Sequence, residues 1–98
     1  MNKGGYVYIM SNKNHTVLYT GVTTDLVKRV GQHKEHLFNG FSNKYNTELL
    51  MYYEFYASIE QAIEKEKIVK GGSRKKKLAL IKSVNPEGRD LYDQIRGL

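Results

Sequence analysis

One predicted helix carries a carboxylate where its pattern calls for a hydrophobic residue. Ile59, Ala62 and Ile63 define an apolar stripe, and the next position on that stripe is Glu66. Burying a carboxylate without a partner is expensive, so Glu66 is expected either to pair with a cation or to coordinate a metal ion. From the residues alone, both interpretations stay open.

A second helical pattern places an arginine and a histidine beside its buried stripe. Arg29 lies about one turn after Leu26 and one turn before His33, so the guanidinium and the imidazole share a face. An arginine there could stabilise charge that develops on a phosphate, through bidentate hydrogen bonds that lysine cannot offer. Packing of the arginine stem on the surface is the alternative.

Two strand tyrosines could join such a site. Alternation puts Tyr6 and Tyr8 on one face of a predicted strand, and Tyr19 and Gly21 on one face of the next. Strand tyrosines usually belong to the core, with the hydroxyl reaching water. A catalytic role therefore depends on several polar residues converging from separate elements.

The first half of the chain predicts a β-hairpin and then a helix. Residues 5–10 and 16–20 are rich in β-forming residues, and turn-forming residues separate them. Residues 23–25 offer N-cap oxygens, and Asn39-Gly40 ends the helical run. The helical spacing is carried by Leu26, Val30, His33 and Leu37.

The second half predicts a strand and three helices. Residues 48–57 are aromatic and aliphatic, as in a strand. Residues 58–61 resemble a capping box, and Gly71-Gly72 ends the helix that it opens. Ser73 caps a further helix that ends before Pro86. The apolar face of that helix is Leu78, Leu80, Ile81 and Val84, and a last short helix contains Leu91, Tyr92 and Ile95.

This order of elements indicates an α+β domain. It contains no strand-helix-strand repeat, so a small antiparallel sheet covered by helices is expected. The length suits a single domain over residues 1–98, with a core at about 4–84 and a C-terminal helical extension at 85–98.

The composition limits the chemistry. The chain has no cysteine, which excludes disulfides, thiolate zinc sites and a cysteine nucleophile. A metal ion would be held by oxygen or imidazole, which points to magnesium or manganese. No apolar run approaches the ~20 residues that span a bilayer, and the N-terminus lacks a signal-peptide core, so no membrane association and a cytoplasmic location are expected.

The positive charge is clustered. Sixteen Lys and Arg residues against ten Asp and Glu residues leave a net charge of +6. A polyanion such as nucleic acid is the natural partner, although a lysine-rich helix face is often only a solvated surface. The candidate nucleic-acid-binding residues here are Lys70, Arg74, Lys75, Lys76 and Lys77.

These residues form an ordered pattern along nearly the whole chain. Tyr6-Val7-Tyr8 and Tyr19-Thr20-Gly21 are separated by ten residues. They are followed by Thr23-Thr24-Asp25-Leu26, Arg29, His33, the run from Ala62 to Lys67, Lys70-Gly71, Arg74, Lys76-Lys77, Leu80-Ile81, Asn85-Pro86-Glu87 and Arg89-Asp90-Leu91. In this pattern the chain resembles the GIY-YIG nuclease superfamily, specifically the small single-domain UPF0213 (YhbQ-like) group.

The resemblance implies a three-stranded antiparallel sheet flanked by helices, with a phosphodiester-hydrolysing site that uses one divalent metal ion, Mg²⁺ or Mn²⁺. It assigns water activation to Tyr19, support of that tyrosine to Tyr8, phosphate binding to Arg29 and metal binding to Glu66. His33, Lys44 and Tyr45 become auxiliaries for proton transfer or phosphate binding. Asn85 would hold either the nucleic-acid backbone or the local structure.

Three positions depart from the family pattern. Tyr6 replaces the glycine of the first triplet, Gly72 stands where an aromatic residue is common, and Gly88 stands where tryptophan is common. The last two changes could alter the packing of the final helices.

The expected function is that of a metal-dependent DNA endonuclease or exonuclease in repair or recombination, with a protein partner that supplies specificity. The alternative is a nucleic-acid-binding module of a repair assembly that lacks meaningful turnover. A protein-interaction scaffold is a third reading, but it leaves Glu66 and Arg29 unexplained.

Overall fold

The computed structural model describes residues 4–36 and 44–97, and its centre is one three-stranded sheet. Strands β1 (Gly5–Ser11), β2 (Leu18–Thr23) and β3 (Leu49–Tyr56) are antiparallel and lie in the order β2-β1-β3. The hairpin register places Gly21 opposite Tyr8 and Tyr19 opposite Met10. The pairing of β1 with β3 shifts by a bulge between Ile9 and Met10.

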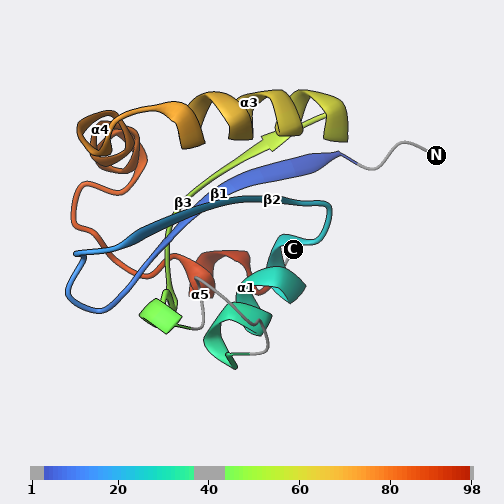
Figure 1. The fold of residues 1–98 in the computed structure, drawn as a ribbon. Helices are drawn as coiled ribbons and strands as arrows, with labels where there is room; N and C mark the ends of the chain where they lie inside the picture. The colour runs from blue at the N-terminus through green and yellow to red at the C-terminus, as the bar shows by residue number, and fades with distance from the viewer. Residues whose placement is uncertain (1–3, 37–43, 98) are drawn as a thin grey trace.

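Helices cover both faces of this sheet (Figure 1). Helix α3 (Ile59–Gly71) lies on one side, whereas α1 (Leu26–Lys34) and α5 (Tyr92–Ile95) lie on the other. Helix α4 (Arg74–Val84) follows α3 at the margin of its layer. Because β1 is the middle strand between two layers, all its residues from 7 to 10 are fully buried.

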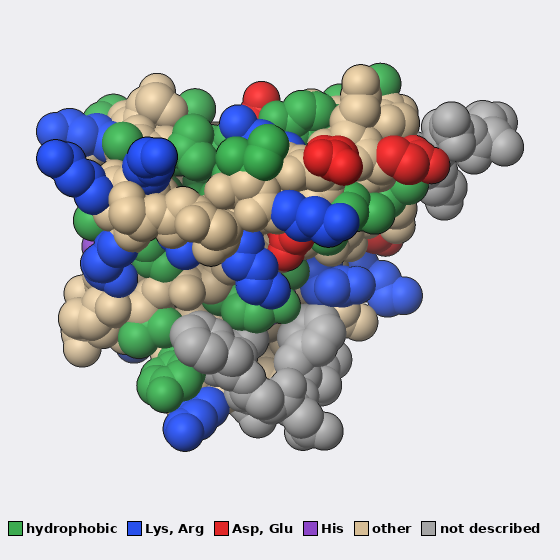
Figure 2. Space-filling model, turned by 45° about the horizontal axis from the view of Figure 1, so that its top comes forward, with side chains coloured by type: hydrophobic (Ala, Val, Ile, Leu, Met, Phe, Trp, Pro, Cys, Tyr) green, Lys and Arg blue, Asp and Glu red, His purple; other side chains and the backbone are tan. Residues whose placement is uncertain are grey.

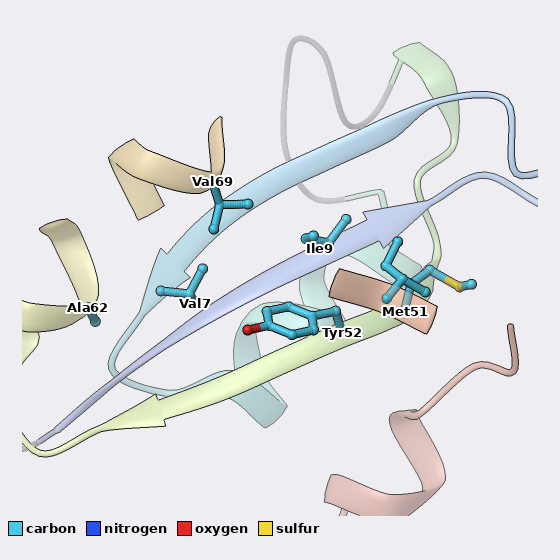
Figure 3. Close-up of a cluster of buried hydrophobic side chains, with 7 residues drawn as sticks. Val7, Ile9, Met51, Tyr52, Ala62 and Val69 are labelled. Carbon is cyan, nitrogen blue, oxygen red and sulfur yellow. The ribbon is translucent and has the colours of Figure 1, made fainter. Parts of the chain in front are cut away.

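Side-chain alternation divides the core into two halves. Val7, Ile9 and Tyr52 pack toward Ala62 and Val69 of α3 (Figure 3). On the opposite face, the core consists of Tyr8, Met10, Leu26, Val30, Leu50, Leu91 and Ile95. The C-terminal segment thus contributes Leu91 and Ile95 to the main core.

Side-chain caps begin three of the helices at the predicted places. Asp25 accepts a hydrogen bond from Lys28 N at the start of α1. Ser58 and Ser73 do the same for Gln61 N in α3 and Lys76 N in α4. The local sequence chemistry therefore sets where these helices start.

The structure corrects two details of the sequence prediction. Helix α1 ends at Lys34 instead of reaching Asn39-Gly40, because His36 adopts a left-handed backbone with φ of 56°. The predicted helical position Leu37 and the predicted stop at Asn39-Gly40 lie outside the described residues. On α4 the predicted apolar face is only partly covered, since Leu78 and Val84 are 42% and 56% exposed at the edge of the layer.

None of the helices within residues 4–36 and 44–97 has both the length and the apolar composition that crossing a membrane requires.

Candidate active site

Four of the predicted site residues meet on the face of the sheet that α1 covers. Tyr8 comes from β1, Tyr19 from β2, and Arg29 and His33 from α1. The Tyr8 hydroxyl lies 3.0 Å from Nε2 of His33, within hydrogen-bond distance. The ring centroid of Tyr19 lies 6.3 Å from that of Tyr8 and 5.0 Å from that of His33. We call these four residues the tyrosine cluster.

The hairpin register makes room for the cluster. Gly21 is the β2 residue directly opposite Tyr8, and a Cβ atom at Gly21 would lie only 2.5 Å from the Cζ and hydroxyl oxygen of Tyr8. The Tyr8 ring therefore occupies the space above Gly21, and any larger residue there would displace it. This explains physically why a glycine follows Tyr19 by two residues.

Burial keeps the centre of the cluster uncharged. Burial raises the pKa of Tyr8 above its ordinary value, and Tyr19 adds to this rise while the charge of Arg29 opposes it. Burial, and then the nearby Arg29 charge, lower the pKa of His33 to about 4. At neutral pH, Tyr8 is a protonated phenol and His33 a neutral imidazole, so the positive charge of the cluster is that of Arg29.

Arg29 also connects the cluster to a surface hollow. This hollow has a volume of about 360 Å³ and opens beside the first turns of α1. Its lining consists of Thr23, Thr24, Asp25, Lys28, Arg29 and Gln32. A phosphate that entered it would approach the cluster from the arginine side.

Glu66 lies in the other helical layer. Helix α3 packs on the opposite face of the sheet, over β1 and β2 (Figure 1). The Glu66 side chain is 15% exposed, and the Lys70 ammonium lies 3.8 Å from its carboxylate. The contacts join Glu66 to Lys70, as the ion-pair interpretation expected, and do not bring it into the tyrosine cluster.

The available ligands suit a metal ion that keeps most of its waters. In the described part of the chain, no three His, Cys, Asp or Glu residues form a group that could hold a metal ion. The Glu66 carboxylate accepts no hydrogen bond within these same residues, and Lys70 lies beyond hydrogen-bond distance. One such carboxylate fits Mg²⁺ or Mn²⁺, because these hard ions take oxygen ligands and Mg²⁺ retains several waters.

Comparison with known proteins assigns the family. The model of the GIY-YIG catalytic domain matches residues 4–79. The chain belongs to the GIY-YIG family. A UPF0213 protein of Clostridium perfringens is 38% identical over 82 residues, which cover 80% of this chain and 83% of that relative. One from Staphylococcus haemolyticus is 33% identical over 76 residues, covering 78% and 92% of the two chains.

A solved structure supports the same fold for this GIY-YIG domain. The solution NMR structure of a UPF0213 protein from Bacillus halodurans is similar with a TM-score of 0.51 and 29% identity, and the match covers 95% of each chain. The predicted family and the three-stranded antiparallel sheet with flanking helices are therefore confirmed. All residues of the tyrosine cluster, and Glu66, lie inside the matched domain.

The basic residues predicted to bind nucleic acid fall into two groups in this GIY-YIG fold. Lys70, Lys75 and Lys76 are exposed, and Lys77 is half-buried. In Figure 2, which brings the α3 and α4 side forward, Lys and Arg side chains are spread over the surface while Asp and Glu gather toward one end. Arg74 differs because its guanidinium donates to the backbone oxygens of Thr16 and His15, at 3.0 and 2.7 Å. Arg74 anchors the hairpin turn.

Asn85 serves the local structure, the second of its two expected roles. Its side chain is 5% exposed and donates to the backbone oxygens of Met51 and Arg89. Its own oxygen accepts from Arg89 N. Both ends of the amide are therefore engaged within the fold, and a contact of Asn85 with nucleic acid stays a prediction.

Lys44 and Tyr45 form a small unit just before β3. The Lys44 ammonium lies 5.4 Å from the centroid of the Tyr45 ring. Tyr45 lines a hollow with the hairpin turn and Glu48, separate from the hollow at Arg29. Their auxiliary role stays a prediction.

Sequence reasoning missed two residues of the α1 hollow. Lys28 and Gln32 lie four residues apart on one side of α1 and line the hollow with Arg29. Their helical spacing was visible in the sequence, but it could not show which side of the helix stays open.

Proposed function

We propose that this GIY-YIG protein is a divalent-metal-dependent nuclease that hydrolyses phosphodiester bonds in DNA. The observation that supports it best is the convergence of Tyr8, Tyr19, His33 and Arg29 from three elements beside a polar hollow. Convergence of this kind is the condition under which strand tyrosines become candidates for catalysis.

In this proposal, three residues of the cluster have separate tasks, and His33 holds one of them in place. Arg29 binds the scissile phosphate and stabilises the charge that develops on its oxygens. Tyr19 is half-buried, so it can reach the attacking water, and it takes a proton from that water as its own phenol proton passes to solvent. Tyr8 is a positioning residue, because its fully buried hydroxyl is held at His33 and stays protonated.

Glu66 is the proposed metal ligand. A bound Mg²⁺ or Mn²⁺ would supply positive charge to the phosphoryl and leaving oxygens. Since α3 lies over β2, and β2 is an edge strand that also carries Tyr19, the proposal requires the substrate to pass this edge between Glu66 and the cluster. Lys70 would exchange its contact with Glu66 for one with the DNA backbone.

The exposed lysines supply binding without sequence readout. Lys75 and Lys76 on α4, with Lys70 and Lys44, present ammonium groups suited to backbone phosphates. Specificity would then come from DNA shape or from a protein partner, as in a repair or recombination assembly.

One observation favours the alternative of a binding module without turnover. Glu66 and the tyrosine cluster lie on opposite faces of the sheet, and the contact of Glu66 is with Lys70. A protein that had kept the fold and the basic surface for binding alone could show this arrangement.

Cleavage of labelled single-stranded, duplex and branched DNA with Mg²⁺, Mn²⁺ or EDTA tests the proposal. Wild type should give metal-dependent products, whereas Arg29→Ala and Glu66→Ala should lose them and retain binding. Glu64→Ala is the matched control, because Glu64 is exposed on the same helix. If wild type cleaves no DNA but still binds it in a salt-sensitive manner, the binding module replaces the nuclease.

A further inference from the structure

The two flanks of α1 differ in what covers them. The buried stripe of α1 consists of Leu26, Val30 and His33. One flank faces the C-terminal segment, where Lys34 pairs with Asp90 and a Cβ atom at Gly31 would lie 3.7 Å from the Tyr92 hydroxyl. The other flank lines the 360 Å³ hollow with Lys28, Arg29 and Gln32. This second flank is open, and it shares Arg29 with the tyrosine cluster.

Lys28 is the lysine on the open flank whose ammonium group is available to bind a phosphate. Lys28 is exposed, and within the described residues its ammonium group has no ion pair or hydrogen bond. Lys34, by contrast, is engaged by Asp90 and by the backbone oxygen of Glu48. The Asp25 carboxylate in the hollow already accepts from Lys28 N as the helix cap.

The lining of the hollow indicates what it can hold. All six lining side chains are polar or charged, and none is aromatic, so a stacked base would find no partner there. A sugar-phosphate backbone would find an ammonium, a guanidinium, an amide and hydroxyl groups. Lys28 and Gln32 lie one helical turn apart, roughly 5–6 Å between Cβ atoms, which lets them contact successive parts of one strand.

We propose that the Lys28–Gln32 flank of α1 seats the DNA strand beside the scissile phosphate. Lys28 pairs with the phosphate next to the one at Arg29, and Gln32 hydrogen-bonds an oxygen of the same backbone. The position of the scissile phosphate at Arg29 rests on the proposed nuclease function, but the seating itself requires only binding.

Binding of fluorescein-labelled single-stranded and duplex DNA, in EDTA and over a range of salt concentrations, tests this seat. For Lys28→Ala we expect weaker binding and a plot of log affinity against log salt that is shallower by about 0.9 on duplex or about 0.7 on single strands. Lys28→Arg should restore the slope, because the charge is kept. Gln32→Ala should weaken binding at every salt concentration without changing the slope, because no charge is lost.

Lys13→Ala is the control, since Lys13 is exposed in the hairpin turn, at the other end of the hairpin from α1. Equal slopes for wild type, Lys28→Ala and Lys13→Ala would overturn the seat. If wild type cleaves DNA and Lys28→Ala leaves the slope unchanged, the seat fails and the nuclease stands. If Lys28→Ala shows the expected slope but wild type never cleaves, the seat stands without the nuclease. Absence of salt-sensitive binding by wild type would overturn the seat, whereas the nuclease is tested by cleavage with the metal ion present.

Discussion

Tyr8 and Tyr19 differ in burial, and this difference suits them to different roles. Its side chain has no exposed surface, and burial raises its pKa, so it holds its proton and cannot serve as a base. Tyr19 is half-buried beside the same histidine. The proposal therefore gives proton transfer to Tyr19 and positioning to Tyr8.

The contact between Gly21 and Tyr8 predicts that Gly21→Ala damages both stability and the site. The new Cβ atom would lie 2.5 Å from the Tyr8 hydroxyl oxygen, so the ring must move. We expect a loss of about 1 to 3 kcal/mol in the free energy of unfolding, as for other overpacked sites, measured by urea denaturation. Gly71→Ala is the control, because no atom of the described residues would lie within 4 Å of its new Cβ atom, and alanine in a helix should be neutral or stabilising. An equal effect of both substitutions would contradict the account.

The lowered pKa of His33 predicts a pH dependence of stability. In the unfolded chain, a histidine binds its proton below its ordinary pKa of ~6.5, whereas folded His33 does so only below about 4. The unfolded state thus binds more protons between these values, so stability falls as the pH drops through this window and is fully present above it. The contribution is about 3 kcal/mol at most. His33→Gln should have a flatter profile in denaturation experiments from pH 4 to 8, and an unchanged slope would refute the assignment.

At the scale of elements, the segment after α4 is tied to β3. Leu91 N donates to the backbone oxygen of Leu50, and the Asp90 carboxylate accepts from Leu50 N. Asn85 adds its bond to the backbone of Met51. The C-terminal segment therefore holds α5 against the core behind the tyrosine cluster.

Asn85→Ala should consequently lower stability and leave DNA binding unchanged. The substitution removes one buried and two part-buried hydrogen bonds and leaves the backbone oxygen of Met51 without this partner, which should cost about 2 to 3 kcal/mol. Ser83→Ala is a suitable control, since Ser83 is exposed and, among the described residues, its hydroxyl bonds just the backbone oxygen of Leu80 in its own helix. A changed salt dependence of DNA binding with normal stability would instead support the nucleic-acid role of Asn85.

Local chemistry accounts for the features that the sequence predicted well. The caps at Asp25, Ser58 and Ser73 depend on a few neighbouring residues, and so does the hairpin. The covered flank of α1 and the exposed Leu78 depend on packing between distant segments, which periodicity alone cannot determine. The same limit applies to Glu66. Its position on the apolar stripe of its helix could be read from the sequence, but the face of the sheet on which that helix packs could not.

At the scale of the whole molecule, the exposed lysines proposed to bind DNA lie mainly on the helices and not on the strands. Lys75 and Lys76 are exposed at the start of α4, the helix at the margin of the α3 layer (Figure 1). Arg74, although adjacent in sequence, is held by the hairpin. Neighbouring basic residues therefore differ in role: Lys75 and Lys76 are available to bind a polyanion, whereas Arg74 stabilises the hairpin turn.

Removing two of the available charges should weaken DNA binding through its salt dependence. The double substitution Lys75→Ala/Lys76→Ala should make the plot of log affinity against log salt shallower by about 1.8 on duplex DNA, if each lysine meets one phosphate. Arg74→Ala should mainly lower thermal stability. If Arg74→Ala changed the salt slope more than Lys75→Ala/Lys76→Ala did, this division of roles would be contradicted.

The central claim is that Arg29 and Glu66 act on one phosphate from two layers. Single-turnover cleavage rates of wild type, Arg29→Ala, Glu66→Ala and the double variant test it most directly. Residues of one catalytic unit have non-additive effects, so each single substitution should slow cleavage by at least about 100-fold, with the double variant no slower than the slower single variant. Cleavage by Glu66→Ala at the wild-type rate, or losses that multiply in the double variant, would contradict a shared site.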